Sequence, residues 1–386
     1  MKIGINARCI QTENSGLANY TINLLINLLA VSPTEEYYLF SPRQEKHLLL
    51  NDFLSNDLIG DRCHEVLSWP ITLRSGSLVS QLLKVFWEKL YLTHELNQHQ
   101  VDLLHDPSFS LPFNYHKPKI LTIHDLSFLR FPAAFTARTY LYHKFFLGKV
   151  VNMADSIIAV SESVKRDILE FYKKQENKIK VIYEGVNELY LKPDDCGIFQ
   201  EKVNKLVNSK PYILSVSAMN PRKNIPNIIR AFSALSSKHK DLQLVLVGRK
   251  AWGCGEIDKT VNELSLGDRI IFTGYIDDNM LKCLYKSALV FLYPSLYEGF
   301  GLPLLEAMAC GAPVITSNIS SMPEIVGQAG IFVDPHSYDQ IADAIDSVAV
   351  NGAMRKELIL LGKERVKCFS WRKAAEQTLA AYRTLK

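Results

Sequence analysis

Two carboxylates stand close together in a segment of the sequence that is rich in Gly and Pro. Glu298 and Glu306 flank the run Gly-Phe-Gly-Leu-Pro, and Pro303 is well placed for the first turn of a helix. Glu298 then lies in the loop before this helix, and Glu306 lies about one turn inside it. Two carboxylates in this arrangement can hold two separate diol units, one on a sugar ring and the other on a ribose.

The start of the same helix also offers backbone donors. Gly299 and Gly301 permit backbone conformations and close approaches that a side chain would block. The amides around Phe300, Gly301 and Leu302 would lie at the helix N-terminus, where unpaired N–H groups and the helix dipole favour a phosphate or a sugar hydroxyl. The segment therefore predicts a site in which backbone amides and carboxylates bind one ligand together.

Two adjacent cations, Arg222 and Lys223, follow the strand expected at Tyr212–Ser217. Arg can engage a diphosphate through two parallel hydrogen bonds, and Lys adds a point charge. Elsewhere in a protein such a pair would be read as a solvated basic turn. On a loop that leads from a strand into a helix, it suits a diphosphate leaving group, so we expect both residues to bind one.

A His-Asp pair ends another expected strand, Lys119–His124. His124 can hydrogen-bond a bound sugar or the departing oxygens, and Asp125 can orient it or meet the acceptor. A lone His is more often structural than catalytic, and the pair could form only a hydrogen bond within its loop. The other segments favour a site role for His124 and leave that of Asp125 open.

These residues must be positioned by short apolar strands that alternate with helices, a pattern that predicts α/β domains with parallel sheets and helices on both faces. The polar stretch Lys192–Lys210 separates an N-terminal domain, 1–192, from a C-terminal domain, 205–370, and an amphipathic helix at 371–386 packs back onto the first. Ligands of open α/β sheets bind at the carboxyl ends of the strands. Besides the two already given, the expected strands are Lys2–Asn6, Val101–His105, Ser156–Val160, Lys178–Tyr183, Leu242–Val247, Arg269–Thr273, Ala288–Tyr293 and Pro313–Thr316.

Together these segments resemble the E-x7-E signature and its surroundings in retaining glycosyltransferases of family four, also described as group 1. That family has the GT-B architecture, in which two Rossmann-like domains face an interdomain cleft. The resemblance spans nearly the whole chain and thins out over residues 41–100. It implies that Glu298 contacts hydroxyls of the transferred sugar, that Glu306 contacts the ribose, and that Arg222 and Lys223 stabilise the departing diphosphate.

Three further positions match the family less closely. Ile276 falls in the loop whose backbone groups meet the nucleobase in that family. Gly16, before a helix expected at Thr21–Leu29, stands where many relatives have two glycines that bring amides to the donor phosphate. Some relatives have another Arg six residues before the Lys, and because that position is Ser217 here, Arg222 would have to compensate.

The resemblance implies transfer with retention at the anomeric carbon. No Asp or Glu stands out as a covalent nucleophile, whereas double-displacement glycosidases pair two close carboxylates. A front-face mechanism is the better hypothesis, in which the leaving diphosphate helps to deprotonate the acceptor. Since no Asp-x-Asp metal motif is visible, we expect cations of the protein to replace a metal, and no cofactor besides the donor substrate.

The segment His124–Pro132 looks most like mannosyltransferases of surface-polysaccharide and lipopolysaccharide assembly, which favours GDP-mannose as the donor and a glycan or lipid-linked glycan as the acceptor. A UDP-glucose-type donor stays open, because one residue in the base loop can change the nucleotide. Residues 69–99 and 138–151 mix aromatic and aliphatic side chains with Arg and Lys. They are either core helices with a solvated face or a peripheral surface that meets the acceptor at an anionic membrane.

Other activities also fit a two-domain cleft. A nucleotide-sugar epimerase would need acid and base groups on both faces of the ring, and none can be identified in the sequence. A phosphorylase would carry a pyridoxal-binding Lys in a much longer chain. A non-catalytic sugar-nucleotide sensor would bind without turnover, which the combined Arg-Lys and Glu-Glu set makes the weakest alternative.

Composition limits the partners and the compartment. The 386 residues include 44 basic and 40 acidic side chains, and the net charge of +4 argues against nucleic acid. Seven scattered cysteines without a C-x-x-C spacing argue against a zinc site or a disulfide framework and favour a reducing compartment. With no signal peptide and no apolar run of roughly 20 residues, we expect a cytoplasmic protein, at most peripheral at the inner face of the membrane.

Overall fold

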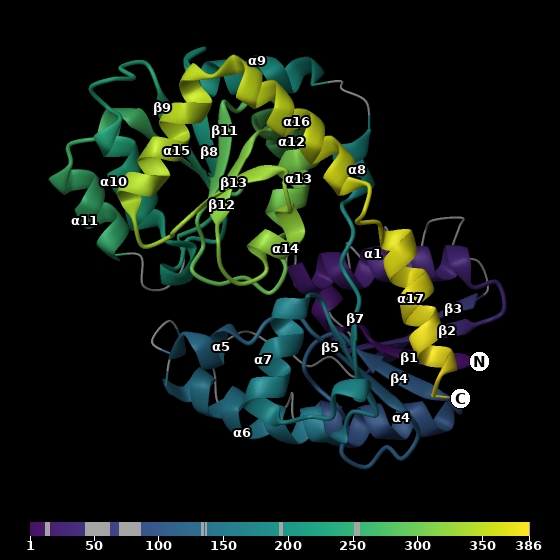
Figure 1. The fold of residues 1–386 in the computed structure, drawn as a ribbon. Coiled ribbons are helices and arrows are strands. Elements are labelled where there is room, and N and C mark those ends of the chain that lie inside the picture. The colour runs from purple at the N-terminus through teal and green to yellow at the C-terminus, as the bar shows by residue number, and fades with distance from the viewer. Residues whose placement is uncertain are drawn as a thin grey trace. The chain divides into compact units, whose positions relative to one another are not determined.

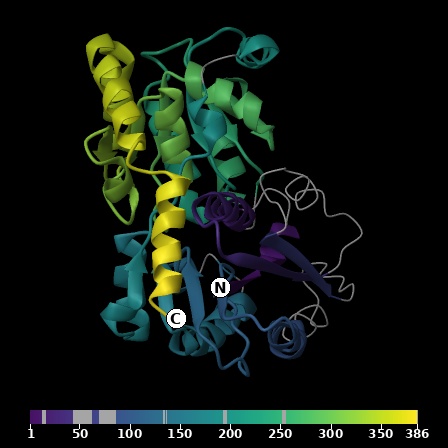
Figure 2. The same ribbon diagram turned by 90° about the vertical axis from the view of Figure 1, so that its right-hand side faces the viewer.

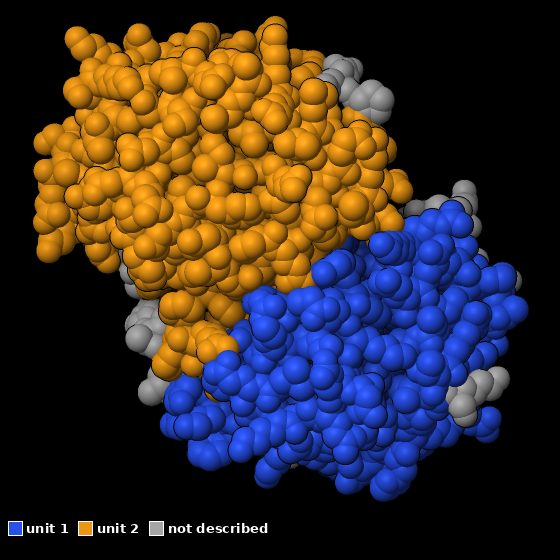
Figure 3. All heavy atoms as spheres, viewed as in Figure 1, with its two compact units in different colours: residues 1–126, 137–185, 371–386 blue, residues 127–136, 186–370 orange. Residues whose placement is uncertain are grey.

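Strands and helices alternate along the chain in the computed structural model, which describes residues 1–11, 16–42, 62–68, 86–132, 135, 137–192, 196–250 and 255–385. The chain divides into two units, which Figure 3 colours separately. Unit 1 comprises Met1–Leu126, Ala137–Gly185 and Trp371–Lys386, and unit 2 comprises Ser127–Thr136 and Val186–Ser370. Each unit is built around one parallel sheet.

The sheet of unit 1 has the strand order β3-β2-β1-β4-β5-β6-β7, and all its neighbouring strands run parallel. The chain adds strands on one side of β1 up to β3 and then adds β4 to β7 on the other side. The switch point, where open α/β sheets bind ligands, therefore lies between β1 and β4. The strands are β1 (Lys2–Asn6), β2 (Glu36–Pro42), β3 (Cys63–Ser68), β4 (Leu103–Asp106), β5 (Lys119–Ile123), β6 (Ser156–Ala159) and β7 (Ile179–Val181).

Helices cover both faces of this sheet, with α1 and α17 on one face and α4 and α6 on the other (Figure 1). The C-terminal helix α17 packs against α1 (Figure 2). Tyr382 Oη on α17 lies 2.7 Å from His105 Nδ1 on β4. Ser161 caps α7 by accepting from the amide of Val164 at 3.1 Å. The helices are α1 (Gly16–Val31), α4 (Leu92–Gln98), α6 (Ala137–Met153), α7 (Glu162–Tyr172) and α17 (Trp371–Arg383).

The sheet of unit 2 has the order β10-β9-β8-β11-β12-β13, again with parallel neighbours. This is the order of a classic dinucleotide-binding sheet, and its switch point lies between β8 and β11. The four central strands of this sheet are almost wholly buried, and strands covered on both faces are rich in apolar side chains. The six strands are β8 (Tyr212–Val216), β9 (Gln243–Val247), β10 (Ile270–Gly274), β11 (Val290–Tyr293), β12 (Val314–Ser317) and β13 (Gly330–Val333).

Two sets of helices cover the sheet of unit 2. On one face α10 packs against α11 and α15, and the α10 residues Ile225, Ile228, Ile229 and Phe232 are buried in a single core cluster. On the other face α13 packs against α8, α12, α14 and α16. The helices are α5 (Ser127–Arg130), α8 (Glu188–Leu191), α9 (Gly197–Leu206), α10 (Ile225–Ala234), α11 (Gly255–Glu263), α12 (Asp278–Ser287), α13 (Leu302–Cys310), α14 (Met322–Val326), α15 (Tyr338–Val350) and α16 (Gly352–Val366).

The sequence analysis did not predict three of the described strands, β2, β3 and β13. The segment of β2, Glu-Tyr-Tyr-Leu-Phe-Ser-Pro, is a short apolar run, and periodicity alone does not separate such a run from a buried piece of helix. The β3 segment, Cys-His-Glu-Val-Leu-Ser, is largely polar because the strand forms the edge of its sheet. Residues 69–85, part of the stretch 69–99 expected to be either core helices or a membrane-facing surface, lie outside the described residues.

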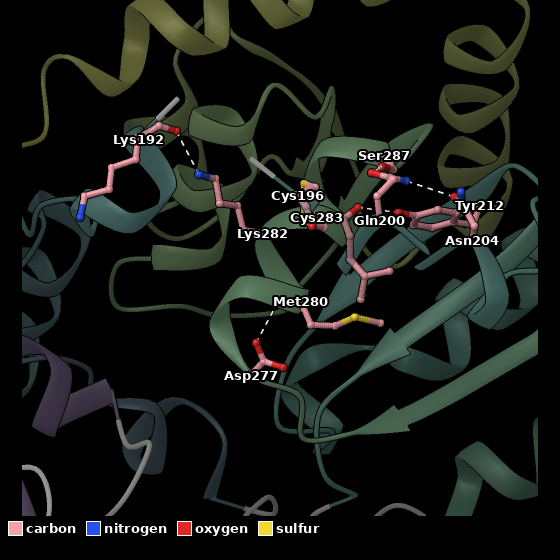
Figure 4. Close-up of a disulfide and its surroundings, with 11 residues drawn as sticks. Lys192, Cys196, Gln200, Asn204, Tyr212, Asp277, Met280, Lys282, Cys283 and Ser287 are labelled. Carbon is pink, nitrogen blue, oxygen red and sulfur yellow. Dashed lines mark hydrogen bonds between the residues drawn. A yellow bond between two sulfur atoms is a disulfide. The ribbon is translucent and has the colours of Figure 1, made fainter. Parts of the chain in front are cut away.

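One disulfide corrects the expectation drawn from the cysteine spacing. Cys196, which precedes α9, is bonded to Cys283 on α12, and their Cα atoms are 5.7 Å apart (Figure 4). The two cysteines are separated by 87 residues and meet because α9 packs against α12, so their spacing along the chain carries no signal of the pairing. In the described part of the chain, no helix is long and apolar enough to cross a bilayer.

We predict that Gly248→Ala strongly destabilises unit 2. Gly248 follows β9 with φ of +126°, and a Cβ there would lie 2.0 Å from the carbonyl oxygen of Ser217, an atom fixed in the backbone. Backbone strain and overpacking together should cost about 3 kcal/mol or more. Gly267→Ala is the matched control, because a Cβ at Gly267 meets nothing within 4 Å. Equal urea midpoints for the two variants would contradict this account.

Candidate donor site

The residues predicted to bind a diphosphate and a sugar meet at the switch point of unit 2. β8 pairs directly with β11, so the loops that follow these two strands emerge side by side at the same edge of the sheet. The loop after β8 carries Arg222 and Lys223, and the loop after β11 carries Glu298. Parallel strand pairing therefore brings together side chains that are about 75 residues apart in the chain.

The loop after β8 is held in a fixed shape by two asparagines. Asn220 accepts a hydrogen bond from the amide of Arg222 at 3.1 Å and so starts the short turn that carries both cations. Asn224 ends this turn in the left-handed conformation, with φ of 60°. Its side-chain amide donates to the carbonyl oxygens of Pro294 and Pro335, at 3.0 and 2.6 Å, and so fastens the loop to its neighbours.

Two serines fix the backbone around Glu298. Ser320 Oγ accepts from the amide of Glu298 at 3.1 Å and donates to the carbonyl oxygen of the same residue at 2.6 Å. Ser321 Oγ lies 3.0 Å from the carbonyl oxygen of Glu298 and 2.8 Å from that of Phe300. The turn before α13 is therefore preorganised by hydroxyl groups from the segment that follows β12.

The three charged side chains form one buried cluster. Glu298 is 6% exposed, and its two carboxylate oxygens each accept from a different cation. Arg222 Nη1 donates to Oε2 at 2.7 Å, and Lys223 Nζ donates to Oε1 at 2.5 Å. Arg222 Nη1 also donates to the carbonyl oxygen of Tyr297, and Lys223 Nζ donates to Tyr293 Oη, each at 2.7 Å.

Electrostatics keep Glu298 ionised in spite of its burial. Burial by itself raises the pKa of a carboxyl group, but the charges of Lys223 and Arg222 outweigh it and lower the pKa of Glu298 to about 2. With two cations and one carboxylate, the cluster carries a net charge of +1. Two cations held at one place attract anions, so this part of unit 2 is suited to anion binding.

The N-terminus of α13 lies directly after Glu298. Gly301 is the N-cap of α13 and has φ of 106°, a conformation that residues with a side chain rarely adopt. Phe300 is buried and its ring meets that of Phe369 edge-on, with the centroids 6.0 Å apart. Leu302, the first residue of the helix, is half-buried. As at any helix N-terminus, the first amides of α13 have no carbonyl one full turn earlier in the helix to donate to. The amide of Leu304 donates instead to the carbonyl oxygen of Gly301, at 2.9 Å.

Glu306 lies farther along α13 and has a different environment. Its Oε2 accepts from Tyr285 Oη on α12 at 2.9 Å. Burial raises the pKa of Glu306 to about 7, the hydrogen bond from Tyr285 works against this rise, and the nearby charge of Asp278 adds to it. The two glutamates of one motif thus differ in ionisation: Glu298 is a fixed anion, whereas Glu306 is close to half-protonated at neutral pH.

The expected base-binding residue, Ile276, lies half-buried in the loop between β10 and α12. In the same region the guanidinium of Arg249, after β9, lies over the exposed ring of Tyr275, 5.8 Å from its centroid. The sequence analysis did not single out either residue. Their only signal in the sequence is their position directly after neighbouring strands of the sheet.

The remaining predicted site residues belong to unit 1. His124 follows β5, and its Nδ1 lies 3.1 Å from Glu184 Oε1. Asp125 is the next residue, before α5, and is half-buried. Gly16 is exposed, and the structure corrects its setting: α1 begins at Gly16, so this glycine opens the helix instead of lying in a loop before a helix at Thr21–Leu29. Residues 16–20 were not predicted to be helical, because Asn and Tyr interrupt the apolar pattern there.

Several residues that complete these clusters were missed in the sequence. Tyr293, Ser320 and Ser321 hold the charged cluster of unit 2, and Glu184 is the partner of His124. Hydroxyl groups are common in all sequences, and only the folded sheet shows which of them lie beside Glu298. Among the described residues, no group of three or more His, Cys, Asp or Glu side chains could hold a metal ion.

We predict that Glu298 contributes about 3 kcal/mol of pH-dependent stability, because its pKa of about 2 lies well below the ordinary 4.5 and one unit corresponds to about 1.4 kcal/mol. The carboxylate favours folding above the ordinary pKa, and this contribution is lost as the pH falls toward 2. Between about pH 6 and about pH 3, the stability gap between wild type and Glu298→Gln should narrow by about 2 kcal/mol. Urea unfolding measures the gap, and a gap independent of pH would contradict the prediction.

Comparisons with known proteins identify the family of the chain. Residues 15–188 match the family model Glycosyltransferase Family 4, and residues 198–365 match the model Glycosyl transferases group 1. The chain is 28% identical over 388 residues to O-antigen chain mannosyltransferase B of Escherichia coli, with 100% of both chains covered.

Solved structures share the fold over the whole chain. Sucrose-phosphate synthase from Thermosynechococcus elongatus superposes with a TM-score of 0.76 at 23% identity, covering 100% of this chain and 99% of that one. HepE from Anabaena, solved with UDP and glucose, gives a TM-score of 0.74 at 17% identity, covering 99% and 98%. The two sheets and the two family models lead to one conclusion: the chain belongs to glycosyltransferase family 4 and is a glycosyltransferase with the GT-B fold.

Proposed function

We propose that this enzyme transfers mannose from GDP-mannose to a glycan or lipid-linked glycan, with retention at the anomeric carbon and without a metal ion. The observation that carries the proposal is the buried cluster of Arg222, Lys223 and Glu298 with its net charge of +1. A donor diphosphate carries the negative charge that Arg222 and Lys223 attract. Arg222 and Lys223 would hold that diphosphate as it departs, the role that a divalent cation has in other enzymes.

The amides around the site extend this binding role. The N-terminus of α13, at Phe300, Gly301 and Leu302, offers backbone donors beside the charged cluster. Gly16 opens α1 in unit 1, and a Cβ at Gly16 would meet nothing within 4 Å. Neither φ nor packing requires a glycine at that position, so a ligand that approaches the backbone is the simplest reason for one. We propose that all these amides bind the phosphates or hydroxyls of the donor.

The two glutamates take different parts of the donor in this proposal. Glu298, an anion at any physiological pH, accepts hydrogen bonds from hydroxyls of the transferred sugar. Glu306, with its pKa of about 7, can both accept and donate, which suits the vicinal diol of a ribose. Ile276, in the loop after β10, meets the nucleobase through its backbone.

The same cluster favours a front-face mechanism. A carboxylate whose pKa is about 2 is a weak base, and the oxygens of Glu298 are already bonded to two cations. Such a group is poorly suited to act as a nucleophile or as a general base. The departing diphosphate would then accept the proton of the acceptor hydroxyl, while Arg222 and Lys223 stabilise the charge that develops on it. His124 and Asp125 in unit 1 would contact the sugar or the acceptor.

The donor is the least constrained part of the proposal. Similarity over the whole chain to an O-antigen mannosyltransferase supports GDP-mannose. A uridine sugar is the second candidate, because one residue in the base loop can change the nucleotide. HepE, solved with UDP and glucose, is only 17% identical and bears on the fold and not on the ligand, so we favour mannose.

Ligand-observed NMR with a panel of nucleotide sugars, in buffer with EDTA, tests the donor site. We expect saturation transfer to GDP-mannose above UDP-glucose and the other sugars, and we expect it to weaken in Glu298→Ala and Arg222→Ala. Losing one buried charged partner of this kind typically costs about 2 kcal/mol or more, a loss of about 30-fold or more in affinity.

The outcomes of this panel separate the parts of the proposal. Preference for a uridine sugar would keep the enzyme class and overturn the mannose assignment. Binding that appears only when a divalent metal is added would overturn the metal-independent mechanism. No binding of any nucleotide sugar to folded protein would overturn the proposal as a whole. Glu376→Ala, on α17, is the control for an exposed glutamate outside the site.

We also propose that unit 1 meets an anionic membrane through α6, at the cytoplasmic face where a lipid-linked acceptor would lie. Leu147, Val150 and Val151 of α6 are buried in unit 1. Its solvent side instead presents large apolar side chains, among which Phe145 is 66% exposed, together with exposed lysines. Aromatic side chains beside lysines favour the interface of an anionic bilayer. The residues on this side are Leu141, Lys144, Phe145, Phe146 and Lys149.

Vesicle sedimentation at low salt tests the α6 surface. We expect the protein to bind vesicles of phosphatidylglycerol and phosphatidylcholine, and to bind pure phosphatidylcholine less. Phe145→Ser with Phe146→Ser should reduce binding by about 10-fold, as expected for losing about 1.4 kcal/mol of apolar insertion. Ile198→Ser, at an equally exposed apolar residue of unit 2, should change nothing. Equal binding by all variants would contradict this assignment.

A further inference from the structure

A buried carboxylate in unit 1, Glu184, contacts His124. Glu184 follows β7 and is 5% exposed, and its Oε1 lies 3.1 Å from Nδ1 of His124. A buried carboxylate needs hydrogen-bond donors, since burial without them costs several kcal/mol. The proton that satisfies Glu184 is therefore the one on Nδ1 of the imidazole. The two residues are 60 positions apart, and the sequence analysis gave Glu184 no role.

The other ring nitrogen of His124, Nε2, differs from Nδ1 in its contacts. Nε2 is buried and has no hydrogen-bond partner among the residues that the structure describes. The ring packs edge-on against Tyr20, with centroids 4.5 Å apart, and against Phe109, with centroids 6.2 Å apart. These neighbours exclude water but offer no hydrogen bond to Nε2. An unpaired buried polar atom is rare in proteins and is often explained by a ligand.

Together the two observations determine which hydrogen bond His124 can offer. A neutral imidazole carries one N–H, and a carboxylate accepts only, so the Glu184 contact places that hydrogen on Nδ1. Nε2 is then left with a lone pair and acts as an acceptor. A phosphate oxygen has no hydrogen to give to this lone pair, whereas a sugar hydroxyl has one.

We propose that Glu184 is a positioning residue that holds His124 in the Nδ1–H tautomer, so that Nε2 accepts a hydrogen bond from a sugar hydroxyl. The assignment of this tautomer rests on the geometry of unit 1 alone. The choice of a sugar as the ligand rests on the proposed glycosyltransfer. Glu184 touches no substrate in this scheme and acts only through His124, in the way that outer carboxylates orient and fix the tautomer of metal-binding histidines.

Nitrogen NMR of the imidazole rings tests the tautomer without substrate. The full-length protein is labelled with ¹⁵N-histidine, and the His124 signals among the ten histidines are identified by their loss in His124→Ala. At a pH where the ring is neutral, we expect a protonated Nδ1 and an unprotonated Nε2. In Glu184→Leu we expect the Nε2–H form, which free imidazole side chains prefer in water. An Nε2–H ring in the wild type, or an unchanged tautomer in Glu184→Leu, would overturn the proposal.

Kinetics of the same variants test whether Glu184 acts through His124. We expect Glu184→Leu to lower kcat by about 10- to 100-fold, as for other residues that orient a histidine. In a His124→Ala background the same substitution should have no further effect, because its only target is gone. Additive losses in the double variant would overturn the positioning role.

A matched variant controls for the loss of a buried carboxylate. Glu35 of unit 1 is also buried and is bonded to Arg383 at 2.9 Å, and it does not contact His124. Glu35→Gln should leave the tautomer of His124 and the value of kcat unchanged. If the donor panel fails while the tautomer behaves as expected, the proposed function is wrong and the Glu184 inference about the ring stands. If the tautomer fails while transfer is observed, only the inference is wrong.

Discussion

The donor site depends on one carboxylate shared between two cations. Glu298 joins Arg222 to Lys223, and so links the loop after β8 to the loop after β11. Each partner alone would be an expensive buried charge, and the three together are tolerable because every charge has a hydrogen-bonded counterpart. The arrangement positions the cations before any ligand arrives, so little reorganisation is needed when charge develops on a leaving group.

The scaffold explains why such a cluster can form at this place. In a parallel sheet all strands end at the same edge, and the change of direction between β8 and β11 leaves two adjacent loops that no crossover covers. Asn224, Ser320 and Ser321 then fasten these loops with hydrogen bonds to backbone carbonyls. Two loops that are far apart in the sequence thereby form one rigid surface.

Much of the fold could be predicted from the sequence, because apolar periodicity and capping are local signals. The cap at Ser161 and the buried face of α10 are examples. The edge strand β3 was missed because few of its residues are apolar, and the bond between Cys196 and Cys283 was missed because it joins helices that meet only after folding. At the site, charged motifs indicated Arg222 and Glu298, whereas the contact of Glu184 with His124 could not be predicted because the two residues are 60 positions apart.

The C-terminal helix has a consequence for the order of folding. The chain passes between the two units four times, and its last passage delivers α17, which packs on α1 and bonds His105 through Tyr382. During synthesis, the face of unit 1 that α1 and α17 cover therefore lacks one of its two helices until every residue of unit 2 has left the ribosome, and α1 is without this packing partner for that time. Unit 2 would be the first to complete its core, although unit 1 begins the chain.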